Sequence, residues 1–285
     1  MSIRNNEERT GIRNPDADAP VEQLNESNSF SFVTPTEFVD LPSEGRFYPE
    51  GHPLHGSDSV EIRYMTAKDE DILTSQTLLK KGIAIDRLLQ NIIIDKNIKV
   101  DDLLVGDKNA LIVATRITGY GDDYEVNITC PTCATVSPHN VVLSELNKVT
   151  ISDDLLQAFD VNQTEQGTFT VNLPKSKVDV EIKLLTGRDE KSLMEISERR
   201  KKHKLQEAML TDQFKSFIVS VNGNSDKNAI SSFVDNMPAY DSRHLRNLYA
   251  NITPNVDMEQ VFSCPECMNI TEVNVPFTVQ FFWPK

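Results

Sequence analysis

The sequence has few cysteines, one tryptophan and a shortage of positive charge. Its 285 residues contain four Cys, and 29 Lys and Arg stand against 43 Asp and Glu, a formal net charge of −14. Proteins that bind the nucleic-acid backbone need a surplus of Lys and Arg for their phosphate contacts. We therefore expect no nucleic-acid partner.

Long apolar segments are also missing. The chain has no run of about 18 apolar residues, so we expect no membrane span. Residues 1–29 lack the apolar segment of a secretory signal, and we expect the protein to stay in a reducing cytoplasm. A hydrophobic content of 39% still allows a sizeable core.

Motifs for catalysis are absent as well. The sequence contains no Walker or dinucleotide-binding motif, and no Gly-x-Ser-x-Gly. His52 and His55 lie in a loop rich in Pro and Gly, where a turn explains them better than a metal site. Because no nucleophile, base and oxyanion set can be assembled, we expect a non-enzymatic protein without a small-molecule substrate.

All four cysteines belong to two Cys-Pro-x-Cys motifs, Cys130 with Cys133 and Cys264 with Cys267. A C-x₂-C turn presents two thiolates to one ion, and two such turns complete a tetrahedral zinc site. We predict that these four residues bind one structural Zn²⁺ per chain. A Cys₄ set leaves no open coordination position, which argues against a catalytic metal.

Two other uses of the cysteines remain as alternatives. Reactive C-x-x-C pairs usually begin a helix, whereas strand-like residues follow both motifs here. Structural disulfides are disfavoured in a reducing compartment. Many zinc knuckles have Gly after the second cysteine, but Ala134 and Met268 occupy those positions.

The two halves of the chain resemble each other. Residues 60–73 (VEIRYMTAKDEDIL) and 180–193 (VEIKLLTGRDEKSL) are identical at seven of fourteen positions. With the cysteine motifs superposed, residues 100–133 align without a gap on 234–267 and are identical at nine positions. The shared order and spacing predict an internal duplication.

The predicted fold is α+β: a strand–helices–zinc-knuckle hairpin unit occurs twice, and one Cys₄ zinc site joins the two halves. The predicted domains are a disordered N-terminal arm (1–35), a first repeat with the CPTC knuckle (36–147), a linker (148–168), and a second repeat with the CPEC knuckle and an aromatic C-terminal strand (169–285).

Local signals predict several element ends. Thr66 is placed to cap a helix that runs to Lys81 and stops at Gly82. A turn is expected at Gly106 and Asp107, followed by a helix. The basic run RRKKHK at 199–204 is interpreted as a solvated helix face. The aromatic C-terminus is interpreted as buried against the knuckles or as a docking plug for a partner.

Several segments together resemble a protein family. The segments are LPSEGRFYPEGHPLHG, VEIRYMTAKDEDIL, LLVGDKNAL followed by GYG and a C-P-x-C hairpin, and the terminal FFWP. They are similar to a baseplate hub subunit of T-even-like contractile-tailed bacteriophages, of the cyanophage type. The resemblance covers about 41–147 and the last 25 or so residues. It implies a non-catalytic virion or assembly protein whose partners are other hub and tail proteins.

These observations predict a zinc-stabilised structural or assembly component of a phage tail baseplate hub. The resemblance implies a location in the virion tail baseplate, after assembly in the host cytoplasm. The alternative is a zinc-ribbon regulator that binds nucleic acid, for which only residues 199–204 offer a basic face.

Overall fold

The computed structural model describes residues 33–275 and 279–282. By its contacts the chain divides into Met1–Val33 and Thr34–Lys285, and every element below belongs to the second unit. Residues 1–32 of the predicted arm lie outside the described residues, as do Trp283 and Pro284. Helices and strands are mixed along the chain, which confirms the α+β class.

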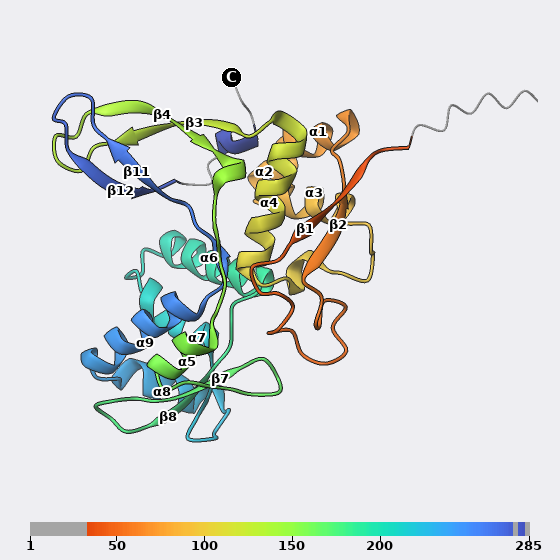
Figure 1. The fold of residues 1–285 in the computed structure, drawn as a ribbon. Coiled ribbons are helices and arrows are strands. Elements are labelled where there is room, and N and C mark those ends of the chain that lie inside the picture. The colour runs from red at the N-terminus through yellow and green to blue at the C-terminus, as the bar shows by residue number, and fades with distance from the viewer. Residues whose placement is uncertain (1–32, 276–278, 283–285) are drawn as a thin grey trace, which may run out of the picture. The chain divides into compact units, whose positions relative to one another are not determined.

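The first part of the unit is an antiparallel strand pair followed by helices (Figure 1). A loop that is largely buried in its first part joins the two strands, and the hairpin β3–β4 completes this part. The elements are β1 (Thr36–Asp40), β2 (Ser59–Arg63), α1 (Ala67–Thr74), α2 (Gln76–Lys80), α3 (Ala84–Ile92), η1 (Val100–Asp102), α4 (Val105–Tyr120), β3 (Asp123–Thr129) and β4 (Val136–Val142).

The middle of the chain forms strand pairs with later segments. Strand β5 pairs with β10 and strand β6 pairs with β7, and both β5 and β6 lie in the predicted linker 148–168. The elements are η2 (Leu143–Glu145), β5 (Lys148–Val149), α5 (Asp153–Ala158) and β6 (Asn162–Gln163).

The last part carries a four-stranded antiparallel sheet, β6-β7-β8-β9, four helices and a second hairpin, β11–β12. We expected a C-terminal strand, but the described end of the chain forms the 3-10 helix η3 (Val279–Phe282). The other elements are β7 (Phe169–Asn172), β8 (Asp179–Ile182), α6 (Gly187–Lys202), α7 (Met209–Phe217), β9 (Ile218–Val221), α8 (Lys227–Asn236), α9 (Ala239–Ile252), β10 (Asn255–Val256), β11 (Glu259–Ser263) and β12 (Ile270–Asn274).

The single helix predicted from Thr66 to Lys81 is interrupted. Ser75 adopts an extended conformation (φ −65°, ψ 106°) and separates α1 from α2. The Thr74 hydroxyl donates to the carbonyl of Glu70 at 2.9 Å, the kind of local bond by which Ser and Thr compete with helical structure. The stop at Gly82 is confirmed, because Gly82 has a φ of +67°.

The turn predicted at Gly106 and Asp107 is wrong, because α4 begins at Val105 and includes both residues. A Cβ at Gly106 would lie 1.8 Å from the carbonyl oxygen of Pro254. Glycine is therefore required here by the close approach of another segment, not by a turn.

Two helix starts have the same architecture in the two parts of the chain. At α1, the Thr66 backbone N–H and hydroxyl donate to Asp69, and Arg63 pairs with that carboxylate at 2.7 Å. At α6, Thr186 makes the same two bonds to Asp189, and a lysine, Lys183, pairs with it at 2.8 Å. Both starts are capping boxes in which Asp replaces the usual Glu.

A buried aspartate holds the strand connection in each part. Asp107 in α4 accepts from the backbone N–H of Ser43 at 2.9 Å, and Asp241 in α9 accepts from that of Lys175 at 2.8 Å. Both carboxylates are fully buried. Ser43 and Lys175 each follow a Leu-Pro pair that comes after the first strand. The Leu-Pro pair is thus a further local match between the two parts of the chain.

The buried side chains form one continuous core that draws on both parts of the chain. Arg116 of α4 is buried within it and donates to the carbonyls of Phe281 (2.7 Å), Asp123 (2.8 Å) and Gly121. Through this one side chain, α4 holds the start of β3 and the helix η3. These contacts position the hairpin that carries the first cysteine pair.

Candidate metal centre

Two β-hairpins carry the cysteines, and they lie side by side (Figure 1). The last strand pairs before the turns are Thr129 with Val136 and Ser263 with Ile270. Polar residues alternate with buried ones along β3, as expected for a strand with one covered face. Each motif thus occupies the turn at the tip of a short two-stranded ribbon.

The backbone of the two turns is the same. The N–H of Cys130 donates to the Thr135 carbonyl and the N–H of Cys264 to that of Asn269, each at 2.9 Å. The N–H of Ala134 and of Met268 donates back to the carbonyl of the first cysteine in its own motif. Identical hydrogen bonding places the two thiols of each motif in the same relative orientation.

Ala134 and Met268 hold the positions where many knuckles have glycine. Both adopt left-handed backbone angles, with φ of 59° and 56°. For a residue with a Cβ, this conformation costs roughly 1–2 kcal/mol. The two turns therefore keep the knuckle shape despite the unfavourable residue, and the sequence departure does not signal a different structure.

The four sulfur atoms form a compact cluster. All lie within 4.8 Å of one another, with 3.7 Å between the Sγ atoms of Cys130 and Cys267 and 3.6 Å between those of Cys133 and Cys264. Four sulfurs around one zinc at about 2.3 Å would be separated by about 3.8 Å. The cluster is thus compatible with one tetrahedral metal ion.

The surroundings of the cluster differ on its two sides. Cys130 and Cys264 are buried, whereas Cys133 and Cys267 are exposed. Phe262 is buried next to the second motif, and its ring meets that of His139 edge-on at 5.8 Å, so β11 also packs against β4. An ion held here would have one dry side and one side facing solvent.

The thiols affect one another's ionisation. Contacts with the hydroxyl and backbone of Thr135 lower the pKa of Cys133 to about 6. The backbone of Asn269 favours ionisation of Cys267, but burial and the neighbouring thiols outweigh it and raise its pKa to about 12. Four thiolates in one place repel each other, and a bound cation would relieve this repulsion.

The histidine pair stays apart from this cluster. His52 stacks on the ring of Tyr48 at 4.4 Å, and His55 Nδ1 contacts the Tyr48 carbonyl oxygen at 2.7 Å. Both serve the packing of the loop between β1 and β2, as the turn interpretation expects.

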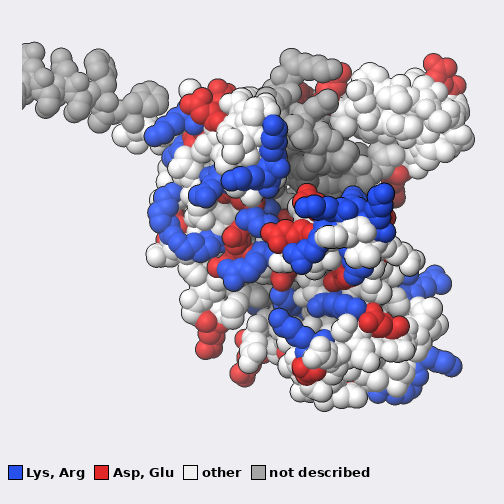
Figure 2. Space-filling view, turned by 180° about the vertical axis from the view of Figure 1, so that it is seen from behind, with Lys and Arg blue, Asp and Glu red and all other residues white. Residues whose placement is uncertain are grey.

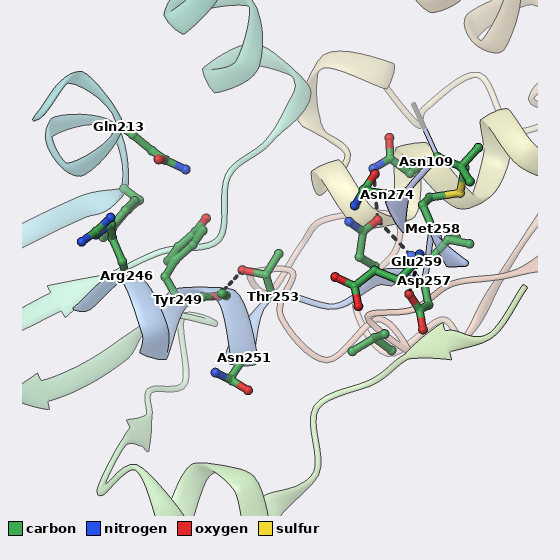
Figure 3. A pocket seen from close by; sticks show the side chains of 16 residues that line it. Asn109, Gln213, Arg246, Tyr249, Asn251, Thr253, Asp257, Met258, Glu259 and Asn274 are labelled. Carbon is green, nitrogen blue, oxygen red and sulfur yellow. Dashed lines mark hydrogen bonds between the residues drawn. The ribbon is translucent and has the colours of Figure 1, made fainter. Parts of the chain in front are cut away.

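A cleft of about 900 Å³ lies between α9 and the strands β10 and β11 (Figure 3). Several of its polar side chains make hydrogen bonds within the chain. Asn255 accepts from Asn109 at 3.0 Å and from the Val256 N–H at 2.9 Å, and the Thr253 hydroxyl donates to the Tyr249 carbonyl at 2.6 Å. These bonds support the join between α9 and the second hairpin.

Fold and site together define an α+β protein with a four-thiol cluster that suits one metal ion. Residues 35–163, from the start of β1 to β6, match the family described as T4 bacteriophage base plate protein. The match covers less than half of the 285 residues and makes this part of the chain similar to a T4-like phage baseplate protein. No curated protein and no solved structure matches the chain. Within the described residues, no helix is both long and apolar enough to cross a membrane.

Proposed function

We propose that the chain is a non-enzymatic structural or assembly component of a phage tail baseplate hub, stabilised by one zinc ion. It acts by docking onto other hub and tail proteins in the virion tail baseplate, after assembly in the host cytoplasm. The observation that carries this proposal is the family match over residues 35–163. The hub position rests on the resemblance of the sequence motifs.

The donor set favours zinc or iron over hard cations such as Mg²⁺ and Ca²⁺. Cys130, Cys133, Cys264 and Cys267 offer four soft thiolates within 4.8 Å of one another, a set typical of Zn²⁺ or of iron. A full set of protein ligands leaves no position for substrate, so the ion is structural. It fixes two hairpins whose cysteines are more than 130 residues apart in the chain.

We further propose that the chain arose by duplication, with repeats at 36–147 and 169–285 and a linker at 148–168. The repeated capping boxes at Thr66 and Thr186, and the buried Asp107 and Asp241, support this origin. In this view each repeat contributes one half of the metal shell.

Metal analysis tests the site. The purified full chain is expected to contain one zinc per molecule, measured by elemental analysis, and to release it on chelation with exposure of four titratable thiols. Cys130→Ser and Cys264→Ser are expected to lower metal content and stability alike, because each breaks the same shell. Stoichiometric iron would replace zinc as the metal, and a difference between the two variants would contradict a shared site.

Particle analysis tests the role. Phage particles and isolated tails are expected to contain the chain by quantitative mass spectrometry if it is a virion component. If particles lack it, a phage in which its gene carries a nonsense codon is expected to make no complete baseplates. Normal baseplates from that phage would exclude both roles.

The exposed basic run at 199–204 favours one alternative, a nucleic-acid-binding regulator. That function predicts salt-sensitive binding of DNA or RNA by the full chain, lost when Arg199, Arg200, Lys201 and Lys202 are neutralised. Absence of such binding at low salt removes this alternative.

A further inference from the structure

Helix α6 has almost no fully buried residues. Of its sixteen residues only Gly187, the first, is buried. Helix α1 begins with the same capping box but ends after eight residues. Helices in proteins gain most of their stability by packing an apolar face. The second half of α6 thus extends beyond what the fold around it requires.

A groove runs between this half of α6 and the start of α7. Its volume is about 540 Å³. Apolar side chains from both helices line it, and two of them are strongly exposed, Met194 at 58% and Met209 at 76%. The apolar lining residues are Val105, Leu185, Leu193, Met194, Ala208 and Met209. Flexible, exposed methionines are common at surfaces that receive a helix from a partner.

Positive charge gathers at one end of the groove. Residues 199–204 carry five Lys and Arg, and Arg200 is the one that pairs with a carboxylate, that of Asp212 at 2.9 Å. In the described part of the chain, no ion pair holds Arg199, Lys201, Lys202 or Lys204. Figure 2 shows Lys and Arg gathered across the middle of one face.

This local charge is opposite to that of the whole chain, which carries −14. Four carboxylates also line the groove: Glu190 pairs with Lys108 and Asp212 with Arg200, whereas Glu198 and Glu207 flank the basic run and leave it net positive. An exposed apolar groove with a cationic end complements a helix that has an apolar stripe and acidic neighbours. Nucleic acid would use the charge but leave Met194 and Met209 without contacts.

We propose that the groove between α6 and α7 binds an acidic amphipathic helix of another tail protein. Apolar side chains of that helix lie on Met194 and Met209, and its carboxylates face Lys201 and Lys202. The inference rests on the proposed docking role, and it adds the surface and the chemistry of the partner.

A peptide titration tests the chemistry. The probes are two labelled 18-residue peptides of equal Leu and Glu content, one with Leu at positions i, i+3, i+4 and i+7 and one scrambled. With the metal-loaded full chain, fluorescence anisotropy is expected to show at least tenfold tighter binding of the amphipathic peptide. Equal binding of both, no binding, or preference for DNA of the same length would overturn the proposal.

Variants of the chain locate the binding. Two double variants are each expected to weaken binding of the amphipathic peptide at least tenfold. One combines Met194→Glu with Met209→Glu, and the other combines Lys201→Glu with Lys202→Glu. Lys80→Glu with Lys81→Glu, at the exposed end of α2, changes charge equally and is the matched control. Circular dichroism and metal content verify that each variant is folded. Loss of binding in the control alone would place the peptide elsewhere.

Photo-crosslinking in assembled tails tests the partner. A photoreactive residue at Met209 is expected to capture an acidic, amphipathic segment of another tail protein, and one at the exposed Tyr240 of α9 is not. Capture of nucleic acid or of a second copy of this chain would contradict the proposal. If tails lack the chain but the peptide still binds, the hub role fails and the groove stands. If tails contain it and Met209 captures nothing, the groove fails.

Discussion

At the scale of single residues, the carboxylate of Asp69 is stabilised in the ionised form. Asp69 is fully buried and receives hydrogen bonds from Arg63, Thr66 and Asn91. Burial raises the pKa of Asp69, but these bonds outweigh burial and hold it well below its usual range. The folded state therefore favours the carboxylate more than the unfolded chain does.

The lowered pKa of Asp69 predicts a pH dependence. A group whose pKa falls on folding contributes stability above its unfolded pKa of about 3.9, and that contribution is lost as the pH falls further. Asp69→Asn is expected to cost about 2 kcal/mol at pH 7, because Arg63 loses its charged partner. The difference from the unsubstituted protein is expected to shrink below pH 4.

Urea unfolding at pH 7 and at pH 3 measures this difference. Asp71→Asn is the control, since Asp71 is exposed in the same helix and is expected to change stability little at either pH. A cost for Asp69→Asn that does not change with pH would show that the carboxylate charge is not the cause.

The two knuckle turns predict a stabilising change. Ala134 and Met268 have positive φ, which glycine adopts without strain. Glycine also makes the unfolded chain more flexible, so the net gain is smaller than the strain relieved. Ala134→Gly and Met268→Gly are each expected to stabilise the metal-loaded protein by about 0.5–1 kcal/mol.

Chemical denaturation of the metal-loaded protein measures the gain. Ala250→Gly, in the exposed face of α9, is the control and is expected to destabilise by about 1 kcal/mol, because glycine disfavours helix. Destabilisation by all three substitutions would mean that the turns carry no strain.

At the scale of elements, helix α4 packs against elements from both ends of the described chain, among them β1, α6 and β10. It contains Gly106 and Gly119, and both are expected to favour alanine by helix propensity alone, by about 1 kcal/mol. Their surroundings differ. A Cβ at Gly106 meets the backbone of Pro254, whereas a Cβ at Gly119 meets the flexible end of Met65.

This contrast predicts opposite effects of the same substitution in one helix. Gly106→Ala is expected to destabilise the protein by roughly 2–3 kcal/mol, since backbone cannot move aside without separating α4 from β10. Gly119→Ala is expected to be neutral or stabilising, because Met65 can choose another rotamer. Thermal unfolding of both variants measures the effect, and similar stabilities would contradict the close approach at Gly106.

At the scale of the whole molecule, the four-thiol cluster joins the tips of two hairpins, and the hairpins themselves add Tyr124, Ile128 and Phe262 to the buried core that extends over the described chain. Removal of the metal is therefore expected to loosen the hairpins before the core. Hydrogen exchange after chelation is expected to accelerate at 123–142 and 259–274 and to stay slow in α4 and α9. Acceleration everywhere at once would mean that the metal is required for the entire fold.

Much of the local structure was predictable because its causes lie close together in the sequence. The capping residue Thr66, the stop at Gly82 and the hairpins around the cysteines all follow from residues a few positions apart. The α+β class follows from the sum of such signals. That all four cysteines meet in one cluster was predicted from the two C-x₂-C motifs, and the structure brings them together. Their metal remains a prediction.

The sequence by itself thus determined the helix start at Thr66, the hairpins and the thiol donors, since these depend on backbone preferences and side chains within one or two turns. Only the tertiary structure decided that Gly106 belongs inside α4, that Asp107 and Asp241 bind distant loops, and that Val279–Phe282 form a 3-10 helix. These features arise from contacts between segments far apart in the chain, and no local pattern records which segments will meet.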